Sequence, residues 1–336
     1  MSVPFHVLGM GWALPETVID NEFLHKEVGL KKGDDWVSSR LGIYERRSVL
    51  SRDYIVKTKN ADPAQAIVHA RARGETTVTL GVRAAQKALA QAGVGPRQIG
   101  MVVVNCDLPF DPVPNTASFI AKDLGVRSGP HIDMNSACSS FARHMQYLSD
   151  LRDEAWPEFV LTVQTSCYTT RTNYAADSID GYIWGDGAAA QVCSLKHAGR
   201  LRVEPLFYAS EPSGAADVYV DSTKHFWQDG RKIREFSIRK TVETFEAIAA
   251  AKKLYAEDVY TVTHQANKVM MDSILGHLHL PPERSIHNVE KQGNIAAAGM
   301  PSAVAQRLDS LHKGDKIVYA VLGAGLAWGG GLMEVL

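Results

Sequence analysis

Cysteine is scarce in this chain, which has only four among 336 residues: Cys106, Cys138, Cys167 and Cys193. No two of them form a Cys-x-x-Cys pair, so the sequence indicates neither a disulfide scaffold nor a cysteine-based zinc site. His277, His279 and His287 lie close together in the sequence, but their spacing fits no metal-binding pattern. We therefore expect no bound metal, and each cysteine is judged by its own surroundings.

An excess of charge is also absent, because 36 basic and 37 acidic residues give a net charge of −1 at pH 7. This balance gives no electrostatic reason to expect a nucleic acid or a membrane surface as partner. No apolar run approaches the roughly 20 residues that span a bilayer. The first residues, MSVPFHVLGMGW, lack the basic region of a signal peptide. We expect a soluble cytoplasmic protein with a large buried core.

Short apolar runs alternate with longer segments of helical period, which is the pattern of an α/β protein. Six runs fall into two triplets, and within each triplet the starts lie roughly 30 residues apart, which suits a strand followed by a crossover helix. Amphipathic segments at 74–93 and 234–254 precede the triplets and predict helices. The runs are MVVVNCD (101–107), HIDMNSA (131–137), FVLTVQTS (159–166), VYTVTHQA (259–266), SIHNVE (285–290) and KIVYAVLGAG (316–325).

This arrangement predicts two similar α/β halves, residues 1–194 and 195–336, related by an internal duplication without obvious sequence identity. Two such halves are expected to pack against each other and to share one central site. The segment 195–233 shows little periodicity and is expected to link them. A second irregular segment, 48–73, is expected to form a short helix or a lid.

Cys138 is expected at a strand-to-helix junction, because it follows the apolar run 131–137 and precedes an amphipathic segment. At such a junction the unpaired N–H groups of the first helical turn favour thiolate over thiol. A thiolate is a good nucleophile toward a thioester. The alternative is a small buried core cysteine, and local context alone divides the two evenly. Cys106 is a weaker candidate because Pro109 soon interrupts any helix, and Cys167 and Cys193 have less support still.

His264 and Asn294 are the second-half residues that suit this chemistry. Each lies where a predicted strand ends, and by the duplication Asn294 is expected where Cys138 stands in the first half. Taken singly, a satisfied core histidine and a helix N-cap are the favoured interpretations. Taken jointly with Cys138, they predict two donors aimed at one point. The glycine-rich segment 322–332 is no P-loop, and we expect it to turn backbone N–H groups toward the nucleophile.

At this point the motifs resemble one family, the β-ketoacyl-acyl-carrier-protein synthase III-like branch of the thiolase superfamily. The likeness covers nearly the whole chain, and His264 and Asn294 are 30 residues apart, as in the family pattern. The resemblance implies a Cys-His-Asn triad, a five-layered αβαβα fold and a homodimer. It also implies coenzyme A or phosphopantetheine thioesters as substrates, an acyl carrier protein as partner, and no bound cofactor. The motifs are LPETVIDN near the start, DDWVSSRLGIYERR (34–47), the Cys138 junction, WGDGAAA (184–190), THQAN (263–267), GNIAAAG (293–299) and GAGLAWG (323–329).

The resemblance also assigns individual residues. It implies that Trp36 and Arg40 hold the adenine end of coenzyme A and that Arg171 lies on the other face of the ring, because an indole and a guanidinium can sandwich a purine. It implies that Ala324, in place of a glycine, supplies an N–H that completes an oxyanion hole with the N–H of Cys138. Alanine keeps this donor, so the function survives if the backbone angles suit it.

Three departures from the family pattern concern substrates. Segment 48–73 is longer than usual, and Val113 replaces an aromatic residue that lines the acyl pocket at the dimer interface. After Asn267, itself expected to bind substrate, the family has a basic residue for carrier docking in second position, where this chain has Val269. These departures favour a specialised condensing enzyme, which loads an acyl group on Cys138 and joins it to a malonyl- or β-ketoacyl thioester in polyketide or similar metabolism. The alternatives are a fatty-acid initiation enzyme, acyl transfer to an alcohol or amine, and a non-catalytic subunit, which should lack part of the triad.

Overall fold

One mixed sheet of nine hydrogen-bonded strands runs through the part of the chain that this computed structural model describes, residues 3–221 and 223–336. Its strands are β1 (Phe5–Ala13), β4 (Ile99–Cys106), β5 (His131–Asp133), β6 (Phe159–Cys167), β7 (Asp186–Ser194), β8 (Leu201–Ser210), β11 (Val259–Thr263), β12 (Lys316–Gly323) and β13 (Ala327–Val335). Their order is β11-β12-β13-β8-β1-β7-β6-β4-β5, so each half of the chain contributes one contiguous half of the sheet.

The two halves of the sheet have the same topology. β4 and β6 are parallel in the first half, as β11 and β12 are in the second. The next strand along, β7 or β13, is antiparallel to its neighbours in both. The antiparallel pair β1 and β8 joins the halves. The boundary that we predicted between residues 194 and 195 falls between β7 and β8, and as a domain boundary it stays a prediction.

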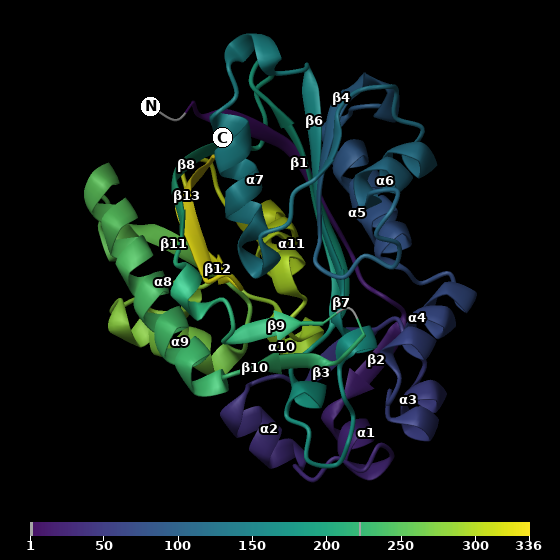
Figure 1. Ribbon diagram of the computed structural model, residues 1–336. Helices are drawn as coiled ribbons and strands as arrows, with labels where there is room; N and C mark the ends of the chain where they lie inside the picture. Colours follow the sequence, from purple (N-terminus) through teal and green to yellow (C-terminus); the bar gives the residue numbers. More distant parts are fainter. Residues whose placement is uncertain (1–2, 222) are drawn as a thin grey trace.

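Helices cover both faces of the sheet and fill the space between its halves, which gives the five layers visible in Figure 1. From one side to the other the layers are α5 with α6, the first-half strands, α7 with α11, the second-half strands, and α8 with α9. The predicted αβαβα architecture is thus confirmed. The helices are α1 (Asn21–Lys26), α2 (Asp34–Arg40), α3 (Arg52–Thr58), α4 (Pro63–Ala72), α5 (Thr77–Ala92), α6 (Thr116–Leu124), α7 (Ser140–Ser149), α8 (Gly230–Lys252), α9 (Lys268–His277), α10 (Val289–Gln292) and α11 (Gly299–Arg307).

The close packing of α5 on β1 follows from the sequence. Thr76 and Thr79 form a capping box at the start of the helix, and Gly93 ends it in the left-handed conformation. On the strand, a Cβ at Gly9 or Gly11 would lie 2.4 or 2.1 Å from a carbonyl oxygen of α5, so both positions must be glycine. The Gly-x-Gly pair near the N-terminus is therefore a packing device.

Two sequence-based expectations fail in detail. The segment 195–233 was expected to be an aperiodic linker, but it contains β8, which pairs with both β1 and β13. Of the run 285–290, only Ser285 makes a strand-like bridge, to Thr261, and α10 begins four residues later. The segment 48–73 forms α3 and α4, with Ser51 and Asp62 as N-caps, as the helix alternative predicted.

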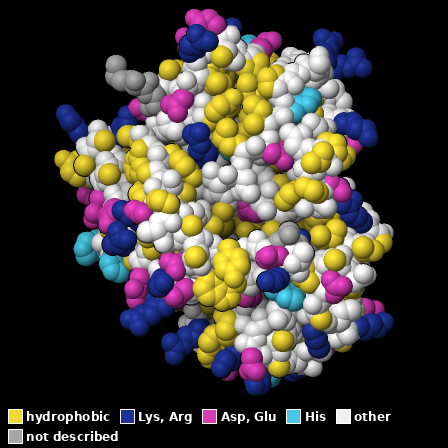
Figure 2. All heavy atoms as spheres, viewed as in Figure 1, with side chains coloured by type: hydrophobic (Ala, Val, Ile, Leu, Met, Phe, Trp, Pro, Cys, Tyr) yellow, Lys and Arg dark blue, Asp and Glu magenta, His cyan; other side chains and the backbone are white. Residues whose placement is uncertain are grey.

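Two small two-stranded antiparallel sheets complete the fold. β2 (Thr17–Asp20) pairs with β3 (Glu45–Ser48) near α1 and α2. β9 (Val218–Val220) pairs with β10 (Phe226–Gln228), and this second pair lies between α9 and β7 in Figure 1. Figure 2 shows apolar side chains gathered over this pair, where Tyr219 and Trp227 are 51% and 47% exposed.

Candidate active site

Cys138 lies in a short 3₁₀ turn, Ala137–Ser139, that leads directly into α7. The preceding residue, Ala137, has a φ of 48°, and its N–H donates to Asn135 Oδ1 at 2.7 Å. This turn connects β5 to α7, and Cys138 as a whole residue is of intermediate exposure there. The predicted strand-to-helix junction is present, with a left-handed residue at its centre.

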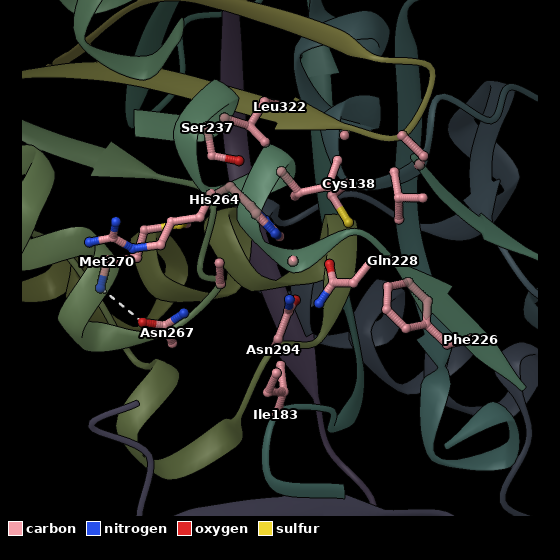
Figure 3. Close-up of a pocket in the computed structure, with 18 of the residues that line it drawn as sticks. Cys138, Ile183, Phe226, Gln228, Ser237, His264, Asn267, Met270, Asn294 and Leu322 are labelled. Atoms are coloured by element: carbon pink, nitrogen blue, oxygen red, sulfur yellow. Dashed lines mark hydrogen bonds between the residues drawn. The ribbon is translucent and has the colours of Figure 1, made fainter. Parts of the chain in front are cut away.

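His264 and Asn294 reach the same place from the second half. His264 directly follows β11, and Asn294 lies between α10 and α11. The Asn294 side-chain oxygen accepts the N–H of Ala296 at 2.9 Å, so its NH₂ group is the part left for the cavity. Figure 3 shows the Cys138 sulfur, the His264 ring and the Asn294 amide turned toward one space. The structure therefore brings the three predicted residues together.

The space that they share is a cavity of about 270 Å³. Beyond the triad it is lined mainly by apolar side chains, and Arg234 is the one charged residue among the described residues that line it. The ring of Tyr168 stacks on Trp184 with centroids 4.1 Å apart, and Phe226 meets both rings edge-on. Other lining residues are Ile183, Val218, Gln228, Ser237, Asn267, Met270, Leu322 and Ala324.

The glycine-rich turn after β12 approaches the nucleophile closely. A Cβ at Gly323 would lie 2.8 Å from the backbone nitrogen of Cys138 and 2.7 Å from that of Ser139, so only glycine fits there. Ala324 follows it and lines the cavity. Its position suits the predicted second N–H of an oxyanion hole, and that role stays a prediction.

Electrostatics at the two key side chains are set by burial. Burial, and secondly the charge of Asp107, raise the pKa of the Cys138 thiol well above its usual range, and the backbone N–H of Cys138 only partly opposes this. Burial lowers the pKa of His264 to about 4, so the imidazole is neutral at physiological pH. The helix-stabilised thiolate expected from the sequence is therefore not the resting form, since desolvation outweighs the N–H groups.

The register of the duplication also differs from the expectation. Asn135 and Asn294 each accept the N–H of the second residue after them, and each of those residues is a left-handed alanine, Ala137 with φ 48° and Ala296 with φ 51°. Asn294 therefore corresponds to Asn135, and the second-half counterpart of Cys138 is Ala297. The expectation that Asn294 stands where Cys138 stands was wrong by three residues, because the shared feature is the backbone turn.

The predicted substrate residues are scattered around this centre. Trp36 is half-buried and Arg40 exposed on α2, where the Lys32 ammonium lies 5.3 Å from the Trp36 ring centroid. Arg171 follows β6 and is only 6% exposed. Val113 is 83% exposed in the loop before α6. Among these predicted substrate residues, only Asn267, the N-cap of α9, lines the cavity. The substrate roles of all five stay predictions.

Sequence reasoning missed several lining residues. Phe226, Gln228 and Arg234 lie in or next to the segment that was expected to be a linker, and no periodic pattern marks them. Tyr168 directly follows β6, a position at the end of a buried strand that could have pointed to it. Within residues 3–221 and 223–336, no group of three or more His, Cys, Asp or Glu side chains is placed to hold a metal ion. In the same residues, no helix is both long and apolar enough to cross a bilayer.

Comparisons with known proteins agree with this architecture. Residues 249–335 match the family model described as 3-oxoacyl-[acyl-carrier-protein] synthase III C terminal. The chain is 29% identical to a β-ketoacyl-[acyl-carrier-protein] synthase III of Rubrobacter xylanophilus over 98% of each chain. It is 28% identical to the Bacillus pumilus protein of the same name over 96% of each.

Solved structures extend the likeness to the fold. A 3-oxoacyl-(acyl carrier protein) synthase III from Pseudomonas aeruginosa superposes with a TM-score of 0.85 at 25% identity, covering 99% of this chain and 98% of that one. A tetronic acid condensing enzyme has the same fold, with a TM-score of 0.84 at 19% identity and coverage of 98% and 99%. The chain is thus similar to 3-oxoacyl-[acyl-carrier-protein] synthases III over nearly its whole length, which confirms the resemblance drawn from its motifs.

Proposed function

We propose that this ketosynthase III-like protein is a condensing enzyme that loads an acyl group on Cys138 and joins it to a second acyl thioester. The observation that carries the proposal is the meeting of Cys138, His264 and Asn294 in one cavity, on a chain that is similar to β-ketoacyl-acyl-carrier-protein synthases III along its whole length. The apolar lining suits an acyl chain, and the neutral His264 suits a hydrogen-bond donor or a proton acceptor.

The first half-reaction acylates Cys138. His264 takes the thiol proton as the sulfur attacks the thioester carbonyl, and the proton leaves with the departing thiol. The N–H groups of Cys138 and Ala324 receive the oxyanion of the tetrahedral intermediate. Proton removal must accompany attack, because the buried thiol resists ionisation on its own.

The second half-reaction forms the carbon–carbon bond. A malonyl- or β-ketoacyl thioester enters with its carbonyl oxygen between His264 and the NH₂ of Asn294. Loss of CO₂ or of a proton places negative charge on that oxygen, and both donors stabilise this charge more strongly than the ground state. The carbanion attacks the acyl-cysteine, and the Cys138 thiolate leaves and is reprotonated.

The substrates are expected to arrive on coenzyme A or on the phosphopantetheine arm of an acyl carrier protein, and no bound cofactor is required. An acidic carrier protein would dock on basic surface residues, but much of the positive charge of segment 48–73 is engaged within the chain. Arg71 pairs with Asp111 at 2.7 Å, and Arg73 donates to Thr17. Lys59 donates to the Val28 carbonyl. Lys57 remains exposed and is the residue of this segment best placed to meet an acidic carrier.

Acyl transfer to an alcohol or amine is the second candidate, because a neutral histidine is also a competent general base. Intact-protein mass spectrometry with a panel of acyl-coenzyme A and acyl-carrier donors tests the first step. Adding a malonyl or β-ketoacyl thioester, or a simple alcohol or amine, to the acyl-enzyme tests the second. A β-keto product supports condensation, an ester or amide supports transfer, and the absence of any adduct on Cys138 contradicts both.

A further inference from the structure

A partly buried chain of polar groups runs from the cavity wall to the turn that carries the nucleophile. Tyr168, which lines the cavity, has its hydroxyl 3.4 Å from Asp107 Oδ2. Asp107 Oδ1 accepts from Asn105 Nδ2 at 2.8 Å, and the same NH₂ group lies 3.2 Å from Asn135 Oδ1. Asn135 Oδ1 in turn holds the N–H of Ala137, the residue before Cys138.

The orientation of the Asn105 amide among these polar groups costs folding free energy. Asn105 is fully buried, and its Oδ1 has no hydrogen-bond partner among the described residues. Turning the amide over would satisfy nothing, since it would place oxygen against two acceptors, on Asp107 and Asn135. A buried carbonyl without a hydrogen-bond partner destabilises the folded state. Such a cost calls for a functional explanation.

We propose that Asp107 is a further residue of this active site, which anchors the turn presenting Cys138 and opposes negative charge on its sulfur. The inference rests on the proposed function in that Cys138 is the nucleophile. Asp107 reaches the turn through Asn105 and acts on the sulfur through its electrostatic field, so it is a positioning residue and not a catalytic one.

The groups around the sulfur single out Asp107 as the one whose charge matters near neutral pH. His264 is neutral there, and burial raises the pKa of Tyr168 above its ordinary value and that of Cys106 to about 12. Burial also raises the pKa of Asp107 to about 6, so its carboxyl is ionised above that pH. Arg234, on α8, is the charged residue of the cavity lining and is exposed.

The consequence is a nucleophile held as a thiol until substrate arrives. The ionised Asp107 carboxylate raises the pKa of the Cys138 thiol and so disfavours the thiolate that iodoacetamide or an oxidant would attack. An acyl thioester instead meets a thiol whose proton can pass to His264 during attack. The anchored turn keeps the sulfur aimed into the cavity meanwhile.

The test is the pH dependence of Cys138 alkylation by iodoacetamide, followed by intact mass and peptide mapping, which needs no knowledge of the natural acyl group. Asp107→Asn removes the charge and keeps the shape, so the alkylation midpoint should move to lower pH by about one unit. Asp107→Ser removes the same charge with a smaller hydrogen-bonding side chain. Asp111→Asn, in the same loop, is the matched control and should leave the midpoint in place.

Asn135→Ala tests the anchor separately, because it keeps the Asp107 charge and cuts its link to the turn. It should leave the midpoint unmoved and slow acyl loading about tenfold, the order expected when a positioning contact is lost. An unmoved midpoint in both Asp107 variants overturns the proposal, and so does a failure of both to fold, which would make Asp107 purely structural. Normal loading by Asn135→Ala overturns the anchoring role. Absence of acyl loading in the unmodified protein would count against the proposed function and leave the alkylation result standing.

Discussion

The two halves of the molecule contain the same turn, but the turns carry different chemistry. In the first half the residue after the left-handed alanine is Cys138, and in the second it is the buried Ala297. The asparagine that opens the turn is exposed in the first half, as Asn135, and is 4% exposed at the cavity in the second, as Asn294. The duplication thus supplies a backbone geometry twice, and the side chains divide acylation and charge stabilisation between the halves.

The largest expected effect comes from removing the nucleophilic cysteine from the first-half turn and placing a cysteine in the second-half turn instead. Cys138→Ala should abolish the acyl adduct with every donor, because Cys106, Cys167 and Cys193 are buried away from the cavity. Adding Ala297→Cys to this variant should not restore it, because Ala297 does not line the cavity. Intact mass spectrometry measures both. An adduct in the single variant would contradict Cys138 as the acylated residue, and an adduct that appears only in the double variant would show that the turns are interchangeable.

The next effect separates the two half-reactions. Asn294→Ala should slow condensation by about 10²–10³-fold, the usual loss for one oxyanion donor, and should change the rate of Cys138 acylation much less. His264→Ala should also slow acylation, because His264 is the proton acceptor there as well. Single-turnover loading, followed by quenched product formation, resolves the two steps. An equal loss in both steps for Asn294→Ala would contradict the division of labour between the halves.

The features of the two halves that can be predicted from the sequence are those that depend on local interactions. Strand-to-helix alternation and the positions of Cys138, His264 and Asn294 follow from short patterns and motifs. β8 was missed because Pro205 argues against a strand inside a sheet. The structure accommodates this proline opposite a register shift between Gly330 and Gly331 of β13, more than 120 residues away. Nothing near Pro205 in the sequence announces that partner.

The same limit explains what was missed at the site. The three-residue error in the duplication arose because the motifs carry no backbone angles, and the positive φ at Ala137 and Ala296 sets the register. Asp107 and Asn105 lie at the end of β4. They are linked to the Cys138 turn only through Asn135, which follows the neighbouring strand β5 and lies within hydrogen-bond distance of Asn105. Burial, which no motif reports, decides that the resting cysteine is a thiol.

His144 in the first half and His264 in the second are both buried, and they are expected to differ in their contribution to stability. Burial lowers the pKa of both His144 and His264 to about 4. His144 lies 2.9 Å from the Met134 carbonyl and 3.1 Å from the Gln164 amide, so both its ring nitrogens are used. No hydrogen bond to the His264 ring is found among the described residues. His144 is therefore a hydrogen-bonded core histidine, whereas the His264 ring faces the cavity.

Since both pKa values are lower in the folded protein, the unfolded chain binds more protons between pH 6.5 and 4. The contribution of each neutral histidine to the free energy of unfolding is therefore fully present above about pH 6.5. It is lost as the pH falls toward 4, by at most about 3 kcal/mol for each residue. His264→Asn should flatten this dependence at little cost at pH 7, and His144→Asn should also destabilise at pH 7. Urea unfolding across pH measures both. Equal losses at pH 7 would refute the distinction.

The smallest effect concerns a loop that belongs to the first half only. Val113 is 83% exposed, and in the predicted homodimer it lies near the acyl pocket of the other subunit. Val113→Phe places a larger side chain at a position that is open in the monomer, so it should leave folding and Cys138 acylation by short donors unchanged. If the loop reaches the partner's pocket, the added ring should shorten the longest accepted acyl chain. Competition among thioesters of increasing length, scored by adduct mass, measures this. An unchanged profile, or a monomer by light scattering at micromolar concentration, would show that each chain completes its own acyl pocket.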